Sequence, residues 1–201
     1  MTEILDAAKE VCGLGFFPIA VHIDGELAKH PVGKGWQKLR YQAPDCEKVF
    51  GNGKNYGLGV LMGISHRDDK LVPCDLDWDC SEAIRAAAII GTPPTSRVFG
   101  HAFAPDSHHE YLVQAGFKSH ATFEDPVLAA AGKKDEEHLA IAEVHGVGRQ
   151  VVYPPTPHQK GGARTWSARG DFTVHQYQHI YGCAAVVSAA VLFARYGGDE
   201  W

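Results

Sequence analysis

The chain has 201 residues, of which 45% are hydrophobic and 21% charged, with a formal net charge of -5 at pH 7. This composition excludes wholesale disorder, and the acidic balance excludes a broadly basic nucleic-acid coat while leaving a local basic groove open. The five cysteines contain no CxxC pair, which argues against a disulfide framework or a thiolate zinc site and predicts a cytoplasmic location. The N-terminus lacks the positive charge of a signal peptide, and the apolar run at 183–194 is short for a membrane span, so we expect no membrane association.

The first half of the chain alternates apolar runs with segments rich in glycine, proline and charge. Helical spacing of apolar residues predicts helices, and short apolar runs between turn signals predict strands. We expect a helix at 3–12, a strand at 16–23, a surface loop at 26–45, paired strands at 56–63 and 70–77, and a helix at 82–90 that begins with an Asp79–Glu82 capping box.

The second half predicts strands in hairpins, without helices between them, and a closing helix. That order favours an α+β domain with a mixed or antiparallel sheet and flanking helices, spanning 1–201 as a single domain. The expected elements are strands at 97–100 and 109–113 separated by a loop, a polar insertion at 117–138, a hairpin of 139–145 with 150–153, a short strand at 164–167, and a helix at 174–196.

The segment LVPCDLDWD (71–79) is an apolar strand that ends in acidic residues. Because side chains two apart on a strand share a face, Asp75 and Asp77 project together and repel one another unless a cation lies between them. Two carboxylates at this spacing suit Mg²⁺ or Mn²⁺, which usually also takes substrate phosphates as ligands. A pair of solvated acids at the end of a strand is an equally good interpretation of the spacing alone. Asp79 continues the alternation, but its position favours helix capping.

Two further segments carry polar groups into strands. In SHHEY, the histidines could contact a phosphate or a metal, or lie on an exposed face, and the latter is favoured in a chain with twelve histidines. Glu143 interrupts the apolar run LAIAEVH, where a carboxylate is costly unless it is paired or coordinates a cation. A salt bridge to Arg149 or Arg97 is the structural alternative.

The order of these motifs along the chain is more specific than any one of them. A strand with DxD, a strand with Ser-His, and an acid followed by PP[ST]xH resemble the primase–polymerase domain of the archaeo-eukaryotic primase superfamily. The resemblance extends from about residue 17 to 166, through PIAV, KHP, GKGW, NYGLGVLMG, VPCDLDWD, FGHAFAPDSHHEY and EVHGVGRQVVYPPTPHQKGGARTW. It implies a primase-like (RRM-like) sheet core and a nucleotidyltransferase.

The resemblance also implies roles for individual residues. Asp75, Asp77 and Glu143 would form a carboxylate triad that holds Mg²⁺ or Mn²⁺ at the reaction centre. Ser107 and a histidine would contact the phosphates of the incoming nucleotide, and His108, directly after the serine, is preferred to His109. Thr156 and His158 match positions near the nucleotide, whereas Gln150 and Trp166 are expected to be scaffold.

The sequence departs from its relatives where cations are expected. Many relatives carry a Gly-Arg-x-Ser-Lys-Pro-like segment before the second motif, but here His101 and Ala104 stand at the two cationic positions, and His145 stands where an arginine is common. The missing positive charge would have to come from elsewhere in the chain. The candidates are Lys29, Lys34 and Arg97.

The implied activity is template-directed nucleotidyl transfer, in which one ion lowers the pKa of a 3′-hydroxyl and another neutralises the triphosphate. Such a domain would serve a replication protein of a mobile element, phage or bacterium. It would act on single-stranded or primed DNA with dNTPs or NTPs. This chain has no P-loop, so we expect it to work beside a helicase. The alternatives are a metal-dependent nuclease or phosphoesterase and a catalytically weakened binding module. The expected DNA contacts, with a solvated loop and a buried Trp36 as the alternative, are Lys29, Lys34, Trp36, Lys38 and Arg40.

Overall fold

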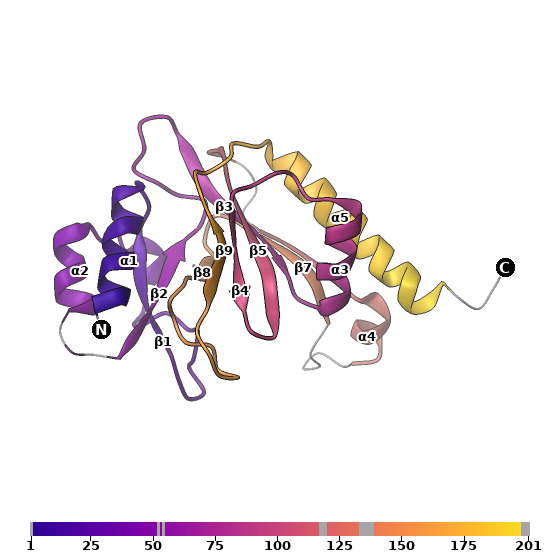
Figure 1. The fold of residues 1–201 in the computed structure, drawn as a ribbon, viewed down its shortest axis with the longest axis horizontal. Coiled ribbons are helices and arrows are strands. Elements are labelled where there is room, and N and C mark those ends of the chain that lie inside the picture. The colour runs from indigo at the N-terminus through magenta and orange to yellow at the C-terminus, as the bar shows by residue number, and fades with distance from the viewer. Residues whose placement is uncertain (1, 52, 54, 117–119, 133–138, 198–201) are drawn as a thin grey trace.

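The computed structural model describes residues 2–51, 53, 55–116, 120–132 and 139–197. Helices lie at both ends of the molecule with strands between them (Figure 1). In chain order the elements are α1 (Thr2–Gly13), β1 (Pro18–His22), the 3₁₀ helix η1 (Trp36–Lys38), α2 (Ala43–Phe50), β2 (Tyr56–Leu61), β3 (Leu71–Trp78), α3 (Ser81–Ile90), β4 (Arg97–His101), β5 (Ala104–Gln114), β6 (His120–Glu124), α4 (Pro126–Ala130), β7 (Ala140–His145), β8 (Gln150–Val152), β9 (Thr165–Arg169) and α5 (Tyr177–Tyr196).

The strands form two antiparallel sheets. The three-stranded sheet has the order β1-β2-β8, and the six-stranded sheet has the order β6-β7-β3-β5-β4-β9. α1 and α2 lie beside β1 and β2 at one end of the molecule, and α3 and α5 lie at the other (Figure 1). The α+β class with an antiparallel sheet, predicted from the sequence, is therefore confirmed.

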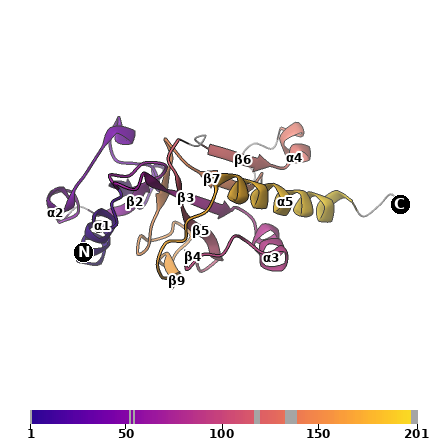
Figure 2. The ribbon, with the colours of Figure 1, turned by 90° about the horizontal axis from the view of Figure 1, so that it is seen from above.

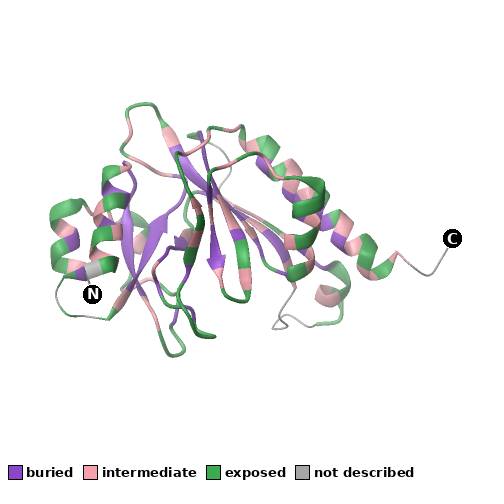
Figure 3. Cartoon of the chain, in the orientation of Figure 1, coloured by how far each residue is buried: buried purple, intermediate pink, exposed green. Residues whose placement is uncertain are grey.

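The central strand β3 separates an apolar face from a polar one. Its residues Cys74, Leu76 and Trp78 join the core formed with α3 and α5, and Figure 2 shows α5 running alongside β7. Because the side chains of a strand alternate, Asp75 and Asp77 lie on the opposite face. Burial follows the same pattern, with buried strands in the middle of the molecule and exposed outer helix surfaces (Figure 3).

The two sheets share a second core. Phe99 of β4 and Leu112 of β5 pack into the cluster made by α1, α2 and the three-stranded sheet, which holds Phe16, Leu58 and Val60. This packing turns the polar face of the six-stranded sheet toward the three-stranded sheet. The facing sheets leave room for a pocket at the end of β3.

Two predicted strand pairings are wrong. The strands expected to pair at 56–63 and 70–77 lie in different sheets, and so do the strands of the expected hairpin of 139–145 with 150–153. Both connections carry the chain from one sheet to the other, and they pack on each other at Gly63. Gly63 has a φ of 71°, and a Cβ there would lie 2.3 Å from the backbone nitrogen of Val147. In the sequence these two short connections resemble hairpin turns, but each is a crossover between the sheets.

Other boundaries also differ from the prediction. The expected loop at 26–45 runs into α2, which begins with a Gln42–Asp45 capping box. The 117–138 segment contains β6 and α4, and its residues 117–119 and 133–138 lie outside the described part of the chain. The expected Asp79–Glu82 capping box is wrong, because α3 has Cys80 as its N-cap and no side-chain cap bond.

Helix α5 is longer than the apolar run that suggested it, and Gly182 does not interrupt it. Within the described residues it is the one helix long and apolar enough to span a membrane, with a mean hydropathy of 1.4. The short apolar run is thus part of a longer helix, and the expectation of no membrane association stays a prediction. Four of its residues, Ile180, Ala184, Val187 and Val191, belong to the core against the six-stranded sheet. This burial is typical of a core helix.

Candidate active site

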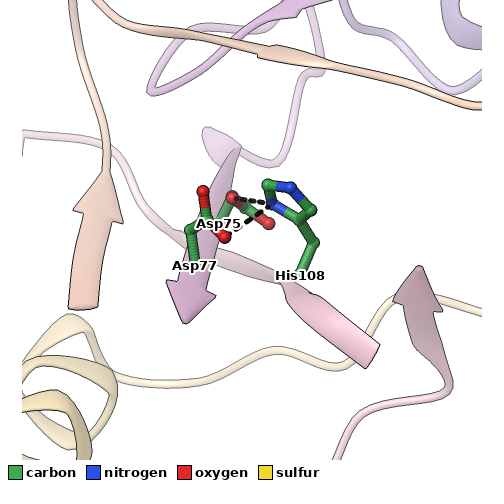
Figure 4. Close-up of side chains that lie close together, drawn as sticks. All are labelled: Asp75, Asp77 and His108. Atoms are coloured by element: carbon green, nitrogen blue, oxygen red, sulfur yellow. Dashed lines mark hydrogen bonds and ion pairs between the residues drawn. The ribbon is translucent and has the colours of Figure 1, made fainter. Parts of the chain in front are cut away.

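The paired acids of β3 meet a histidine from β5. In the antiparallel register Asp77 lies opposite His108, so their side chains share a face. The His108 imidazole lies against both acids (Figure 4), with Nδ1 2.9 Å from Asp75 Oδ2 and 3.5 Å from Asp77 Oδ1. Its other side stacks on the Phe99 ring at 4.4 Å. The ring is therefore held in place on both sides.

β7 brings a third carboxylate to the same face. Glu143 lies opposite Asp77, and His145 lies opposite Asp75. His145 Nε2 is 3.7 Å from Asp77 Oδ2 and 3.6 Å from Glu143 Oε2. On the neighbouring edge strand β6, the Thr122 hydroxyl donates to Glu143 Oε1 at 3.0 Å. The salt bridge between Glu143 and Arg97 that the sequence left open is not formed, because Arg97 pairs with Glu110.

The acids and imidazoles perturb one another electrostatically. Burial alone would lower the pKa of His108, but the carboxylates of Asp77 and Asp75 raise it to about 9. The pKa of His145 is also raised, against the effect of burial, mainly by Asp77. Burial would raise the pKa of Asp77, yet the two imidazoles hold it below its usual range. Positive charge between these carboxylates therefore stabilises the site.

A cavity of about 670 Å³ opens above these residues. This volume lies in the range of small-molecule sites. Asp77, His108 and Glu143 line one side, and Lys29 and Arg164 line the cavity as well. Arg164 is buried and donates to the Pro157 carbonyl at 2.9 Å. Burial lowers its pKa to about 10, which leaves it charged at neutral pH.

Two groups of side chains bring their donor atoms close enough together to hold a divalent cation. Two overlapping groups have their ligand atoms within 4.8 Å of one another: Asp75, Asp77 and His108, and Asp77, Glu143 and His145. In the described structure Asp75 is fully buried, and its Oδ1 has no hydrogen-bond partner. A desolvated, unpartnered carboxylate oxygen is costly unless a cation binds it. The residues thus fit a metal site beside an anion-binding pocket.

Comparison with protein families agrees with this geometry. The family described as "Bifunctional DNA primase/polymerase, N-terminal" (Prim-Pol) matches residues 5–175. The chain belongs to the Prim-Pol family. A search of curated proteins gives no match. The primase–polymerase resemblance and the primase-like fold are thereby confirmed, and Prim-Pol membership supports nucleotidyl transfer of the primase or polymerase type, with DNA and nucleotides as substrates.

The Prim-Pol domain brings part of the predicted site together around one pocket. Asp75, Asp77 and Glu143, which are distant in sequence, converge on one sheet face, and Ser107 lines the cavity with His108. His158 also lines it and stacks on His101, with ring centroids 3.8 Å apart. The alternation along β5 resolves the choice between the two histidines, since His108 faces the acids.

Three expected nucleotide contacts need correction. His109 lies on the opposite face of β5, against Trp78 and Thr92. Arg97 is buried in its ion pair with Glu110 and is therefore not available to a triphosphate. The Thr156 hydroxyl, also buried, accepts a hydrogen bond from Leu58 N at 2.8 Å and ties the chain after β8 to β2. All three are structural in this protein.

Other pocket residues were not predicted. Arg164 follows two glycines in a polar stretch, so no local pattern marked it, although its place soon after PPTPH was a usable signal. Asp79, assigned to a helix cap, lines the pocket instead. His120 and Thr122 belong to β6, which the sequence presented as a polar insertion. The pairing of β6 with β7 could not be inferred from periodicity.

The predicted DNA-binding segment lies on the surface of the three-stranded sheet. Lys34, Lys38 and Arg40 are exposed, and Arg40 Cζ lies 5.1 Å from the Phe17 ring centroid. Trp36 is half-buried against the small cluster of Phe17, Ile19 and Leu61, which favours the alternative in which it packs against the core. Lys29 alone of this group lines the pocket.

Proposed function

We propose that this Prim-Pol domain extends or initiates nucleic-acid chains by template-directed, metal-dependent nucleotidyl transfer at the pocket above β3. The observation that carries the proposal is the pocket itself, where the carboxylates of Asp77 and Glu143 and cationic side chains line one cavity, with the buried Asp75 on the same sheet face. A nucleoside triphosphate with its metal ions needs both charges, because the ions bind the acids and the phosphates bind the cations. Family membership supports the same chemistry.

Asp75, Asp77 and Glu143 are the proposed ligands of Mg²⁺ or Mn²⁺. When bound, such ions lower the pKa of the attacking 3′-hydroxyl and neutralise the triphosphate and the leaving pyrophosphate. The β3–β7 register places Asp77 and Glu143 on adjacent strands, which orients both carboxylates without a substrate. Preorganisation of this kind avoids a cost at the moment of reaction.

The incoming nucleotide would lie against the cationic residues. We propose that Lys29 and Arg164 supply the positive charge that is missing at His101 and Ala104. Arg164 is held by its bond to Pro157 and so presents a fixed guanidinium to the phosphates. Ser107 and His108 are the proposed donors to phosphate oxygens from β5, and His158 borders the same space.

Template DNA would be held through its backbone and by stacking, because a polymerase must accept every sequence. Lys34, Lys38 and Arg40 form the exposed cationic part of the proposed path, with the half-buried Trp36 beside them. We further propose that the domain acts in the cytoplasm, in a replication protein of a mobile element, phage or bacterium, beside a helicase.

The decisive experiment measures incorporation of labelled dNTPs and NTPs on single-stranded and primed templates, with Mg²⁺ and Mn²⁺ compared. Asp75→Ala and Asp77→Ala should each lower the rate by orders of magnitude while the fold persists, because His108 keeps the other acid of the pair as its partner. The matched control is Asp68→Ala, an exposed acid between β2 and β3 that does not line the pocket. Extension at the wild-type rate by the Asp75→Ala/Asp77→Ala double variant would refute the assignment.

The same samples separate the rival functions. A nuclease or phosphoesterase would degrade labelled DNA with metal and without dNTPs. A weakened binding module would bind nucleotide without incorporating it on any template. The cations at Lys29 and Arg164 argue against the second rival, since they replace the charge whose absence suggested it.

A further inference from the structure

His145 lies beside two carboxylates without a hydrogen bond to either of them. Its Nε2 lies 3.7 Å from Asp77 Oδ2 and 3.6 Å from Glu143 Oε2, which is too long for a hydrogen bond. Around a divalent ion with bonds of about 2.1 Å, neighbouring ligand atoms lie roughly 3.0 Å apart in an octahedron and about 3.4 Å apart in a tetrahedron. The two distances from His145 Nε2 are therefore only a few tenths of an ångström longer than the tetrahedral spacing, and the ligand atoms of all three residues lie within 4.8 Å of one another.

The strands fix the direction of this imidazole. His145 ends β7 opposite Asp75, two residues after Glu143, so both side chains project from the same face as the acids of β3. The His120 ring of β6 stacks on it, with centroids 5.5 Å apart and planes at 13°. Only about 12% of the His145 side chain is exposed. The imidazole is thus confined to the direction of the carboxylates.

β6 also supports the acid beside it. His120 Nε2 is 2.7 Å from the Thr122 hydroxyl, which donates to Glu143 Oε1 at 3.0 Å. Groups that orient the ligands of a metal are a regular part of metal sites and tune their affinity. A second observation points to a cation on this face, because Asp75, which lies opposite His145 in the strand register, is buried and its Oδ1 has no partner among the described residues.

We propose that His145 Nε2 joins Asp77 and Glu143 in a nitrogen-containing metal site that prefers Mn²⁺ or Co²⁺ to Mg²⁺. Magnesium favours oxygen ligands, whereas imidazole binds later divalent metals more strongly. This inference rests on the proposed function of the carboxylates and adds the identity of the metal class. It concerns a residue that the sequence marked only as a departure from its relatives, which commonly carry an arginine there.

Pulsed electron paramagnetic resonance tests the ligand directly. With one equivalent of Mn²⁺, the wild-type protein should show the coupling of a directly bound ¹⁴N nucleus. His145→Gln, which keeps a side chain of similar size, should lose this coupling while Mn²⁺ stays bound. The matched control is His179→Gln, an exposed histidine on α5 away from the site, which should keep it. Circular dichroism establishes that each variant is folded.

Metal titration supplies the second measurement. His145→Gln should lower Co²⁺ affinity by at least about tenfold and should change Mg²⁺ affinity far less. Tenfold is the lower end of the loss seen when a group that only orients a metal ligand is removed. A wild-type spectrum without ¹⁴N coupling overturns the proposal. Coupling that persists in His145→Gln also overturns the proposal, because another histidine is then the ligand. Loss of the coupling only in His108→Ala or His120→Ala would identify that histidine.

The outcomes also separate this inference from the proposed function. If Mn²⁺ binds without nitrogen coupling and Asp77→Asn abolishes binding, the carboxylate site stands and the role of His145 is wrong. If the wild-type protein binds no divalent ion and incorporates no nucleotide, both fail. Incorporation that is supported by Mg²⁺ as well as by Mn²⁺, together with equal Mg²⁺ and Co²⁺ affinities, overturns the metal preference alone.

Discussion

A buried ion pair behind the metal site gives the sharpest prediction about a single residue. Arg97 Nε lies 3.0 Å from Glu110 Oε2, with both side chains at most 5% exposed, and the guanidinium lies over the rings of Trp166 and Phe172. Burial raises the pKa of Glu110, and the charge of Arg97 opposes that rise. Arg97→Met would leave this carboxyl unpaired, so we expect a loss of about 3–5 kcal/mol in the free energy of unfolding, measured by urea denaturation.

The matched control is the exposed pair of Arg169 and Glu10. Both side chains are more than 40% exposed, so solvent screens their attraction. Arg169→Met should cost less than about 1 kcal/mol. Equal losses in the two variants would mean that the Arg97 pair contributes no more than a surface contact.

The stacked pair of His101 and His158 predicts how stability depends on pH. Burial lowers the pKa of each imidazole to about 4. The charge of Arg164 adds to this effect for His101, and His101 adds to it for His158. The unfolded chain, with histidine at its ordinary pKa of about 6.5, binds more protons between pH 6.5 and 4. Stability is therefore fully present above pH 6.5 and falls as the pH drops toward 4, measured by urea denaturation in the presence of a chelator.

A double variant isolates this contribution from the other histidines. His101→Gln with His158→Gln should flatten the slope of unfolding free energy between pH 6.5 and 4. His179→Gln, an exposed histidine, should leave the slope unchanged. An unchanged slope in the double variant would show that the pair is not the source.

At the residue scale, local chemistry could be predicted where alternation on one strand decides it. The DxD spacing placed Asp75 and Asp77 on one face, as the register shows. The partners of these acids come from β5 and β7, and strand pairing is a tertiary property that no local pattern encodes. For the same reason the sequence could not show that Arg97 faces Glu110 rather than the pocket.

At the scale of elements, helix α5 contains one polar group that weakens its packing. Ser188, next to the core residue Val187, is 4% exposed, and its hydroxyl has no partner among the described residues. Ser188→Ala removes a desolvated donor and raises helix propensity, so we expect stabilisation of about 1 kcal/mol. This corresponds to a rise of about 2–4 °C in Tm, measured by calorimetry.

The reciprocal change on the exposed side of α5 is the control. Ala189→Ser adds a hydroxyl that water can solvate, so only a helix-propensity cost of about 0.5 kcal/mol should appear. A Ser188→Ala protein less stable than the wild type would show that the hydroxyl makes a bond absent from this structure.

Element by element, prediction succeeded where the pattern is long and local. The terminal helix and the helix at 82–90 were predicted within a few residues, because apolar periodicity and flanking turn residues define both. The predictions failed at β6, whose polar residues are exposed on an edge strand, and at the two crossovers that meet at Gly63. Those features depend on how the two sheets are placed in space, which a one-dimensional pattern does not contain.

At the scale of the whole molecule, the pocket joins the two sheets. The acids belong to the six-stranded sheet, whereas Lys29 follows β1 of the three-stranded sheet, where Gln150 Nε2 donates to its carbonyl at 3.1 Å. A metal-bound triphosphate that contacts both walls would link the sheets. Saturating nucleotide with Mn²⁺ should therefore raise the unfolding free energy, by about 2.7 kcal/mol at a concentration of 100 Kd.

Lys29→Met tests whether the three-stranded sheet contributes to that binding. Loss of one charged contact to phosphate is worth about 1.5–3 kcal/mol, so the KM for dNTP should rise at least about tenfold and the nucleotide-dependent increase in Tm should shrink. The side chain is exposed, so the unliganded protein should keep its Tm. Arg85→Met, an exposed cation on α3 outside the pocket, is the control and should leave KM unchanged. If KM is the same in Lys29→Met as in the wild type, the nucleotide is held by the six-stranded sheet and the segment after β8, and the two sheets do not close on it together.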